Sequence, residues 1–365
     1  MNNQNKFGAF IIFFLFVTQI FPQDQNAISK SFTGFNQLKI QTGSSDFSLK
    51  PSNDSLIHIK YNFTYNSDEY HPKIDSNKNT ILVDDSFFTS HEGGNAFWEI
   101  EAPKKMEINF SGQTSSLSIE GLDVDLIGET STGSFQISKS CGTFNLTTST
   151  GKINLNESKG SLYAVTSTGT LNINKSEISI NSKSTTGVVK ISATKGDEVI
   201  KSETGNIYSE ECRGNFELTS STGSIDLKKI EGKLNCISET GNIYIENPLL
   251  KSNAVFSTTT GNTGLYLNGS PEHNIDINTY SGNVELICPP KFNNVKIEMV
   301  VDDSVGVIQS DLNIGKVIEN YKTSENASIE NPKQRFIKKI INPEISEPSI
   351  KIVTVKGKIK IKAKD

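Results

Sequence analysis

Cysteine and histidine are scarce in this chain. Four cysteines occur in 365 residues, and no two of them are spaced as Cys-x-x-Cys. A small domain framed by disulfides is therefore excluded, and the four histidines show no spacing typical of metal ligands. We expect no metal and no cofactor. The cysteines are Cys141, Cys212, Cys236 and Cys288.

Motifs of the common enzyme classes are also missing. The chain has no Gly-x-Ser-x-Gly, no phosphate-binding loop and no dinucleotide-binding fingerprint. Its formal net charge of −5 provides no basic surface for nucleic acid and no polybasic patch for a membrane. No segment beyond the N-terminus has a helical period of useful length. These absences predict an all-β protein without a nucleic-acid partner.

The longest apolar run lies at the N-terminus. Residues 7–21 form a largely apolar stretch, follow Lys6, and give way to the polar residues Gln23 and Asp24. This run is typical of a signal peptide and falls short of the roughly 18 to 20 apolar residues that span a bilayer. We expect residues 1–22 to be a signal peptide, and the protein to be secreted or held at the cell envelope. After its removal, no integral membrane span is expected.

The middle of the chain contains a regular repeat. Seven Thr-Gly pairs recur with a spacing of 18 residues, and further glycines lie nine residues after several of them. A fixed period over more than 100 residues indicates a repeat architecture. The pairs begin at Thr132, Thr150, Thr168, Thr186, Thr204, Thr222 and Thr240.

The unit of this repeat is a nonamer, used twice in each period. Residues 131–247 divide into thirteen nonamers, and the third position is glycine in twelve of them. The fifth and seventh positions are mostly apolar, and the positions around them are mostly polar. This alternation predicts a strand of about four or five residues, preceded by a turn in which glycine adopts a positive φ. Coils stacked about 4.8 Å apart would bury the fifth and seventh positions in one core.

We therefore predict a parallel β-solenoid, or β-helix, with 18-residue coils and atypical β caps at both ends. Residues 23–110 alternate without a period and are expected to form the N-terminal cap. Residues 111–290 are expected to form the solenoid. A C-terminal cap with a long polar loop is expected over residues 291–365.

Several segments resemble a known family. Residues 204–208, 240–244 and 281–284 read Thr-Gly-Asn-Ile-Tyr, Thr-Gly-Asn-Ile-Tyr and Ser-Gly-Asn-Val, and residues 98–103 precede the coils. These units resemble those of a secreted putative-adhesin domain family of unknown function. The likeness extends over about residues 32–362. It implies a right-handed β-solenoid, and it implies no catalytic residues because the family has no agreed activity.

One outward face carries candidate ligand-binding residues. Tyr208 and Tyr244 share an outward column two coils apart, about 10 Å, with Asp226 between them. Glu203 and Glu239 share a second column. Tyrosine rings beside carboxylates suit stacking against alternate sugars of a glycan. These five residues are the predicted ligand face of a non-enzymatic, adhesin-like scaffold that binds a surface glycan or an envelope protein.

Alternatives to this function stay open at this point. Glu203 and Glu239 have a separation compatible with glycoside cleavage, so a polysaccharide-active enzyme is one alternative. A purely structural envelope protein is another. Ice binding by the threonine column is disfavoured, because these hydroxyls are expected to bond turn backbone groups. Calcium binding is disfavoured because the nonamer lacks a recurrent aspartate.

Overall fold

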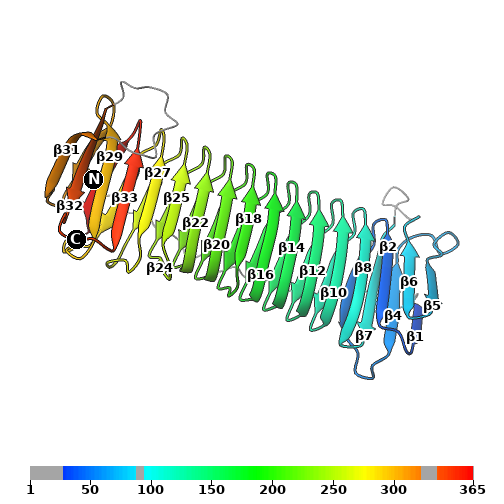
Figure 1. Ribbon diagram of the computed structural model, residues 1–365. Helices are drawn as coiled ribbons and strands as arrows, with labels where there is room; N and C mark the ends of the chain where they lie inside the picture. Colours follow the sequence, from blue (N-terminus) through cyan, green and yellow to red (C-terminus); the bar gives the residue numbers. More distant parts are fainter. Residues whose placement is uncertain (1–27, 88–93, 322–334, 365) are drawn as a thin grey trace, which may run out of the picture.

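A computed structural model describes residues 28–87, 94–321 and 335–364, and the expected signal peptide lies outside them. This described part is all-β and forms an elongated rod of stacked coils (Figure 1). None of its segments is a helix that could cross a membrane. The predicted β-solenoid is therefore confirmed.

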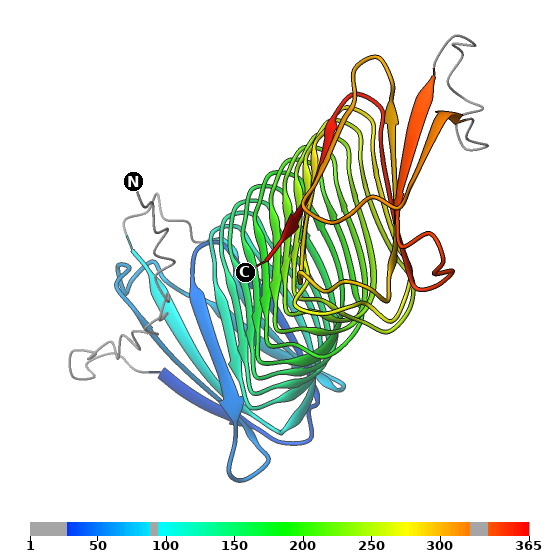
Figure 2. The same cartoon turned by 90° about the vertical axis from the view of Figure 1, so that its left-hand side faces the viewer.

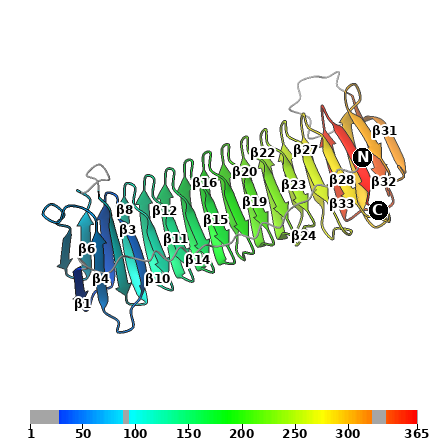
Figure 3. The ribbon, with the colours of Figure 1, turned by 180° about the vertical axis from the view of Figure 1, so that it is seen from behind.

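Two long sheets run along the rod, and each regular coil contributes one strand to each sheet. Sheet A contains 16 strands, most of them short, and Figure 3 shows them from behind. In spatial order they are β1 (Ile28–Phe32), β4 (Ile57–Phe63), β7 (Ala96–Ala102), β3 (Asp46–Pro51), β9 (Leu117–Glu120), β11 (Phe135–Ser138), β13 (Ile153–Asn156), β15 (Leu171–Asn174), β17 (Val189–Ser192), β19 (Ile207–Glu210), β21 (Ile225–Lys228), β23 (Ile243–Glu246), β26 (Thr263–Tyr266), β28 (Val284–Cys288), β34 (Lys358–Ala363) and β30 (Val307–Ser310).

Sheet B contains the longer strands of the coils. In spatial order they are β5 (Lys73–Asn77), β6 (Thr80–Asp85), β2 (Gln37–Thr42), β8 (Lys105–Gly112), β10 (Asp123–Thr130), β12 (Cys141–Thr148), β14 (Lys159–Thr166), β16 (Glu177–Ser184), β18 (Glu198–Ser202), β20 (Arg213–Ser220), β22 (Glu231–Ser238), β24 (Leu249–Leu250) with β25 (Ala254–Thr258), β27 (Ile275–Thr279), β33 (Ser349–Thr354), β29 (Lys296–Asp302), β32 (Phe336–Ile341) and β31 (Lys316–Tyr321).

The repeat sets the register of both sheets. Each residue of β12 pairs in parallel with the residue 18 positions later in β14, and β11 pairs with β13 in the same way. Seen nearly along the rod, successive coils lie behind one another (Figure 2). The fifth and seventh positions of the nonamers, such as Phe135 and Ile137, are buried between the two sheets. The predicted core columns are confirmed.

The turns match the sequence prediction only in part. The two nonamers of a coil form strands of unequal length, four residues in β11 and eight in β12. The glycines of the Thr-Gly pairs do not adopt a positive φ. They are required by close approach, because a Cβ on Gly151 would lie 1.6 Å from the carbonyl oxygen of Gly133. The glycines nine residues further on, such as Gly142 (127°), do adopt a positive φ, as predicted. Non-glycine residues also take a positive φ, as at Lys139 (50°) and Glu157 (52°), in the turn after each short strand.

Buried hydroxyls hold the Thr-Gly turns. Thr148 Oγ1 accepts a hydrogen bond from Gly151 N at 3.0 Å and donates to the carbonyl oxygen of Gly133 at 3.1 Å. The threonines of the pairs bond turn backbone as predicted, for example Thr204 Oγ1 to the carbonyl oxygen of Thr185 at 3.1 Å. Their hydroxyls therefore stabilise the stack of coils.

Both ends of the rod contain a coil inserted out of chain order. Near the N-terminus, β2 lies between β6 and β8, and β3 lies between β7 and β9. Near the C-terminus, β33 lies between β27 and β29, and β34 between β28 and β30. Antiparallel strands β1, β5, β31 and β32 then cover the ends. Such atypical ends limit edge-to-edge association of parallel sheets.

Candidate functional site

Three of the sequence-predicted site residues form one row on the outer face of sheet A. Tyr208 on β19 pairs with Asp226 on β21, and Asp226 pairs with Tyr244 on β23. Tyr208 is 37% exposed and Tyr244 is 39% exposed. We call these three residues the tyrosine row. Each side chain points outward because its neighbours on the strand, such as Ile207 and Ile243, face the core.

The local chemistry of the tyrosine row is mixed. The side-chain amide of Asn206 donates to the hydroxyl oxygen of Tyr208 at 3.0 Å, which orients that ring along its own strand. Asp226 is half-buried between the two tyrosine positions, and this burial raises the pKa of its carboxyl. A carboxylate between two aromatic faces accepts hydrogen bonds from hydroxyl groups of a bound ligand.

The structure places Glu203 and Glu239 away from the tyrosine row. Both are exposed in the turns that lead into β19 and β23, and their backbone N–H groups bond the carbonyl oxygens of Ser184 and Ser220. The five predicted residues therefore divide into the tyrosine row on the sheet and a pair of carboxylates along the turn edge.

Sequence reasoning missed Gly264, which continues the row, and Tyr266, which lies beside it in the neighbouring outward row. Gly264 on β26 pairs with Tyr244, and a Cβ added there would lie 2.8 Å from the Tyr244 ring and 3.2 Å from the Tyr266 ring. Both rings therefore lie over the glycine. Burial, followed by the charge of Glu285, raises the pKa of Tyr266. The signal in the sequence is a glycine at an outward position. The 18-residue period does not align this glycine with Tyr244, because the coil between them is longer than 18 residues.

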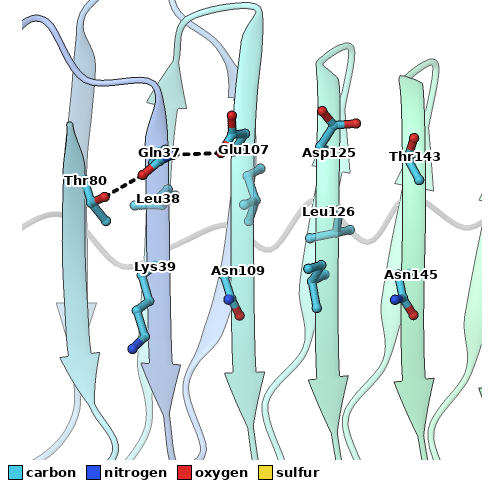
Figure 4. Close-up of a pocket in the computed structure, with 12 residues that line it drawn as sticks. Gln37, Leu38, Lys39, Thr80, Glu107, Asn109, Asp125, Leu126, Thr143 and Asn145 are labelled. Carbon is cyan, nitrogen blue, oxygen red and sulfur yellow. Dashed lines mark hydrogen bonds between the residues drawn. The ribbon is translucent and has the colours of Figure 1, made fainter.

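The outer face of sheet B contains a shallow hollow of about 570 Å³ near the N-terminal end of the rod (Figure 4). Polar side chains from five adjacent strands line it. Gln37 donates to the carboxylate of Glu107 at 2.8 Å and accepts from the hydroxyl of Thr80 at 2.7 Å. Asn109 and Asn145 lie in a neighbouring row on the same face.

The placement of potential metal ligands was compared over the described part of the chain. It contains no group of three or more His, Cys, Asp or Glu side chains placed to hold a metal ion. The hollow offers only two carboxylates, Glu107 and Asp125, on adjacent strands. Four cysteines are free thiols, and Cys141 alone among them is exposed.

Comparison with known proteins identifies a family and similarity to solved structures. The family model described as Toastrack DUF4097, a domain of unknown function, matches residues 33–301. No curated protein matches the chain. Among solved structures, it matches a putative cell adhesion protein from Clostridium sporogenes ATCC 15579 with 10% sequence identity and a TM-score of 0.17. That match covers 93% of this chain and 100% of the other.

Proposed function

This chain belongs to the Toastrack DUF4097 family, and we propose that it is an exported, non-enzymatic scaffold whose tyrosine row binds a surface glycan. The observation that carries the proposal is the pair of exposed rings, Tyr208 and Tyr244, placed two coils apart on either side of Asp226. A rigid solenoid presents such a row without an entropic cost of ordering it.

A glycan fits the row because of its spacing and chemistry. Two coils correspond to about 10 Å along the rod, so the rings contact every second sugar of an extended chain. Sugars offer apolar C–H faces to the rings and hydroxyl groups to the carboxylate of Asp226. Tyr266, lying over Gly264, adds a further aromatic surface on the next coil.

The positions of the remaining carboxylates support a binding role over a catalytic one. Glycoside hydrolysis needs two carboxyl groups on either side of one bond within a water-excluding site. Glu203 and Glu239 lie on exposed turns, and Ser221 occupies the equivalent position between them. If the glycan test is negative, the function to consider next is binding of an envelope protein or a purely structural role.

The test is a glycan array probed with the purified chain lacking residues 1–22. We expect binding by the wild type and loss of binding by the Tyr208→Ala/Tyr244→Ala variant. Tyr280→Ala is the matched control, because Tyr280 is 42% exposed in the turn after β27 and lies outside the tyrosine row. Circular dichroism checks that all three proteins are folded. Absence of binding by the wild type would refute the glycan role.

A further inference from the structure

One outward row of sheet B alternates between amide and apolar side chains. It runs across six successive strands, from β8 to β18, with neighbouring residues in register. The apolar members recur at every second coil, and Ile127 and Tyr163 are 51% and 38% exposed. We call this row the sheet B lane. It consists of Asn109, Ile127, Asn145, Tyr163, Asn181 and Val199.

The lane is open to a ligand along one side. The adjacent outward row contains the short side chains Thr143, Ser161 and Ser179 on three consecutive strands. The hollow of about 570 Å³ lies at the Asn109 end of the lane and includes Ile127 in its lining. Figure 4 shows Asn109 on β8 and Asn145 on β12, on either side of β10.

The spacing of the apolar side chains discriminates between ligand conformations. Two coils separate Ile127 from Tyr163, which is about 9.6 Å at 4.8 Å per strand. A polyproline II helix repeats its contact face every three residues, or about 9.3 Å. An extended β-strand presents side chains on the same face about every 6.7 Å. These side chains would fall out of register with the apolar positions of the lane after one contact. Over the four coils from Ile127 to Val199, the mismatch with polyproline II is only about 0.6 Å.

The amides of the lane complement the backbone of such a helix. A polyproline II helix has no internal hydrogen bonds, so its carbonyl oxygens need external donors. Asn145 and Asn181 lie between successive apolar positions, where their side-chain N–H groups meet those carbonyls. Tyr163 supplies an aromatic surface of the kind on which proline rings dock, and Ile127 and Val199 continue the apolar contact on either side of it.

Charge is concentrated at one end of the lane. Glu107, Asp125 and Glu129 surround its first positions, and Lys39 lies beside Asn109 in the same row. At the other end the charges are mixed, because Lys183 and Lys201 lie near Asp197 and Glu217, and Glu217 pairs with Val199. Ion pairs found in the described part of the chain involve none of these residues. A segment with a basic end near Glu107 and Asp125 matches this distribution.

We propose that the sheet B lane is a docking surface for a proline-rich segment of a partner protein in the polyproline II conformation, with the basic end of that segment near Glu107 and Asp125. This surface is separate from the tyrosine row, which lies on the opposite sheet. The rod would then hold two kinds of partner at once.

The experiment uses a fluorescent peptide with two arginines followed by about nine prolines, and the prolines form about three turns of polyproline II. Anisotropy titration with the full chain is expected to give saturable binding. The Ile127→Asn/Tyr163→Asn/Val199→Asn variant places asparagine at the apolar positions of the lane, as already found on the alternate coils. It should weaken peptide binding at least about tenfold. Ile237→Asn is the matched control, because Ile237 is 41% exposed on sheet B outside the lane.

A second variant tests the charged end. Glu107→Gln/Asp125→Asn/Glu129→Gln should weaken binding of the arginine peptide and leave unchanged the binding of a peptide with serines in place of arginines. If the triple asparagine variant is unfolded by circular dichroism, Tyr163→Asn alone takes its place.

Three results would overturn the proposal. They are no saturable binding of the peptide, equal binding by the wild type and the lane variant, and lane-dependent binding of a β-linked hexasaccharide without binding of the peptide. The last result would assign the lane to a glycan. Loss of glycan binding in the Tyr208→Ala/Tyr244→Ala variant has no bearing on peptide binding, so the two proposals fail independently.

Discussion

The hydroxyl of Ser209 on β19 donates a hydrogen bond of 3.1 Å to the carboxylate of Glu198 on β18, across the core between the two sheets. Thr194 donates to the other oxygen at 3.0 Å. Glu198 is fully buried in a core column where the adjacent coils have Ile180 and Phe216. Burial raises the pKa of Glu198 to about 7, with the neighbouring hydroxyls partly opposing the shift.

The free energy of unfolding should depend on pH through Glu198. Its pKa is higher in the folded than in the unfolded chain, so folding favours the protonated carboxyl. The stability that this group contributes is complete below about pH 4.5 and decreases as the pH rises to about 7, by roughly 3 kcal/mol. Glu198→Leu should therefore gain stability relative to wild type between pH 4.5 and pH 8. Urea unfolding of both proteins at the two pH values measures this.

Cys212 is the titratable group that faces Glu198, and burial, followed by the charge of Glu198, raises the pKa of its thiol. Cys212→Ser is the control for the pH experiment, since it leaves the carboxyl in place. Parallel pH profiles for wild type and Glu198→Leu would show that Glu198 is not the group responsible.

The buried hydroxyl of Thr148 should stabilise its turn measurably. Thr148→Val keeps the shape of the side chain but leaves Gly151 N and the carbonyl oxygen of Gly133 without their partner. We expect a loss of about 1 to 3 kcal/mol in the free energy of unfolding. Thr147→Val, on the outward face of the same strand, is the control and should change stability by less than about 0.5 kcal/mol. Equal effects of the two substitutions would contradict the assigned role.

Gly151→Ala should be far more disruptive than its single methyl group implies. The added Cβ would lie 1.6 Å from the backbone of the preceding coil, which cannot move without breaking the register of both sheets. We expect destabilisation of about 3 kcal/mol or more, seen as a lower urea midpoint. Gly269→Ala provides the comparison, because a Cβ there meets nothing within 4 Å. A small effect at Gly151 would mean that the coils are less tightly stacked than described.

Asp85 should hold the N-terminal end of the rod together. Its carboxylate accepts hydrogen bonds from Ser45, from Tyr70 at 3.0 Å and from the indole of Trp98 at 3.2 Å, all buried. Asp85→Leu leaves these donors unsatisfied and should cost about 3 kcal/mol. Trp98 is the only tryptophan, so its fluorescence reports this end, while circular dichroism reports the whole rod.

We expect the fluorescence transition of Asp85→Leu to move to lower urea than the circular dichroism transition. Asp84→Leu, on the opposite face of the same strand, should leave both transitions near their wild-type positions. Coincident shifts of both signals in Asp85→Leu would indicate that the end and the rod unfold as one unit.

Much of the solenoid could be predicted because its information is local. Alternating apolar residues such as Phe135 and Ile137 indicate strands, and the 18-residue spacing aligns equal positions of successive coils. The turns were harder to predict. Lys139 and Glu157 adopt a positive φ although neither is glycine, since backbone hydrogen bonds such as Lys139 N to the carbonyl oxygen of Asn156 stabilise that conformation.

The candidate site could be predicted only in part, for a similar reason. Tyr208, Asp226 and Tyr244 follow the period and therefore share a row. Tyr266 does not follow it, because two extra residues shift the coil that precedes it. The glutamates at 203 and 239 also follow the period. Their distance from the face of the sheet could not be predicted, because the local sequence pattern does not determine where a turn side chain lies.

By itself, the sequence determined the coil length, the buried columns and the outward position of the tyrosines, because each depends on contacts between residues at a fixed separation. Tertiary structure alone decided the order of the terminal coils, where Leu38 pairs with Ile81 and Ile108 rather than with a residue 18 positions away. It also decided that Glu198 lies between Ser209 of the opposite sheet and Thr194 of the turn that precedes its own strand. Pairings over such long separations depend on which apolar surfaces meet when the ends close, and no local period encodes them.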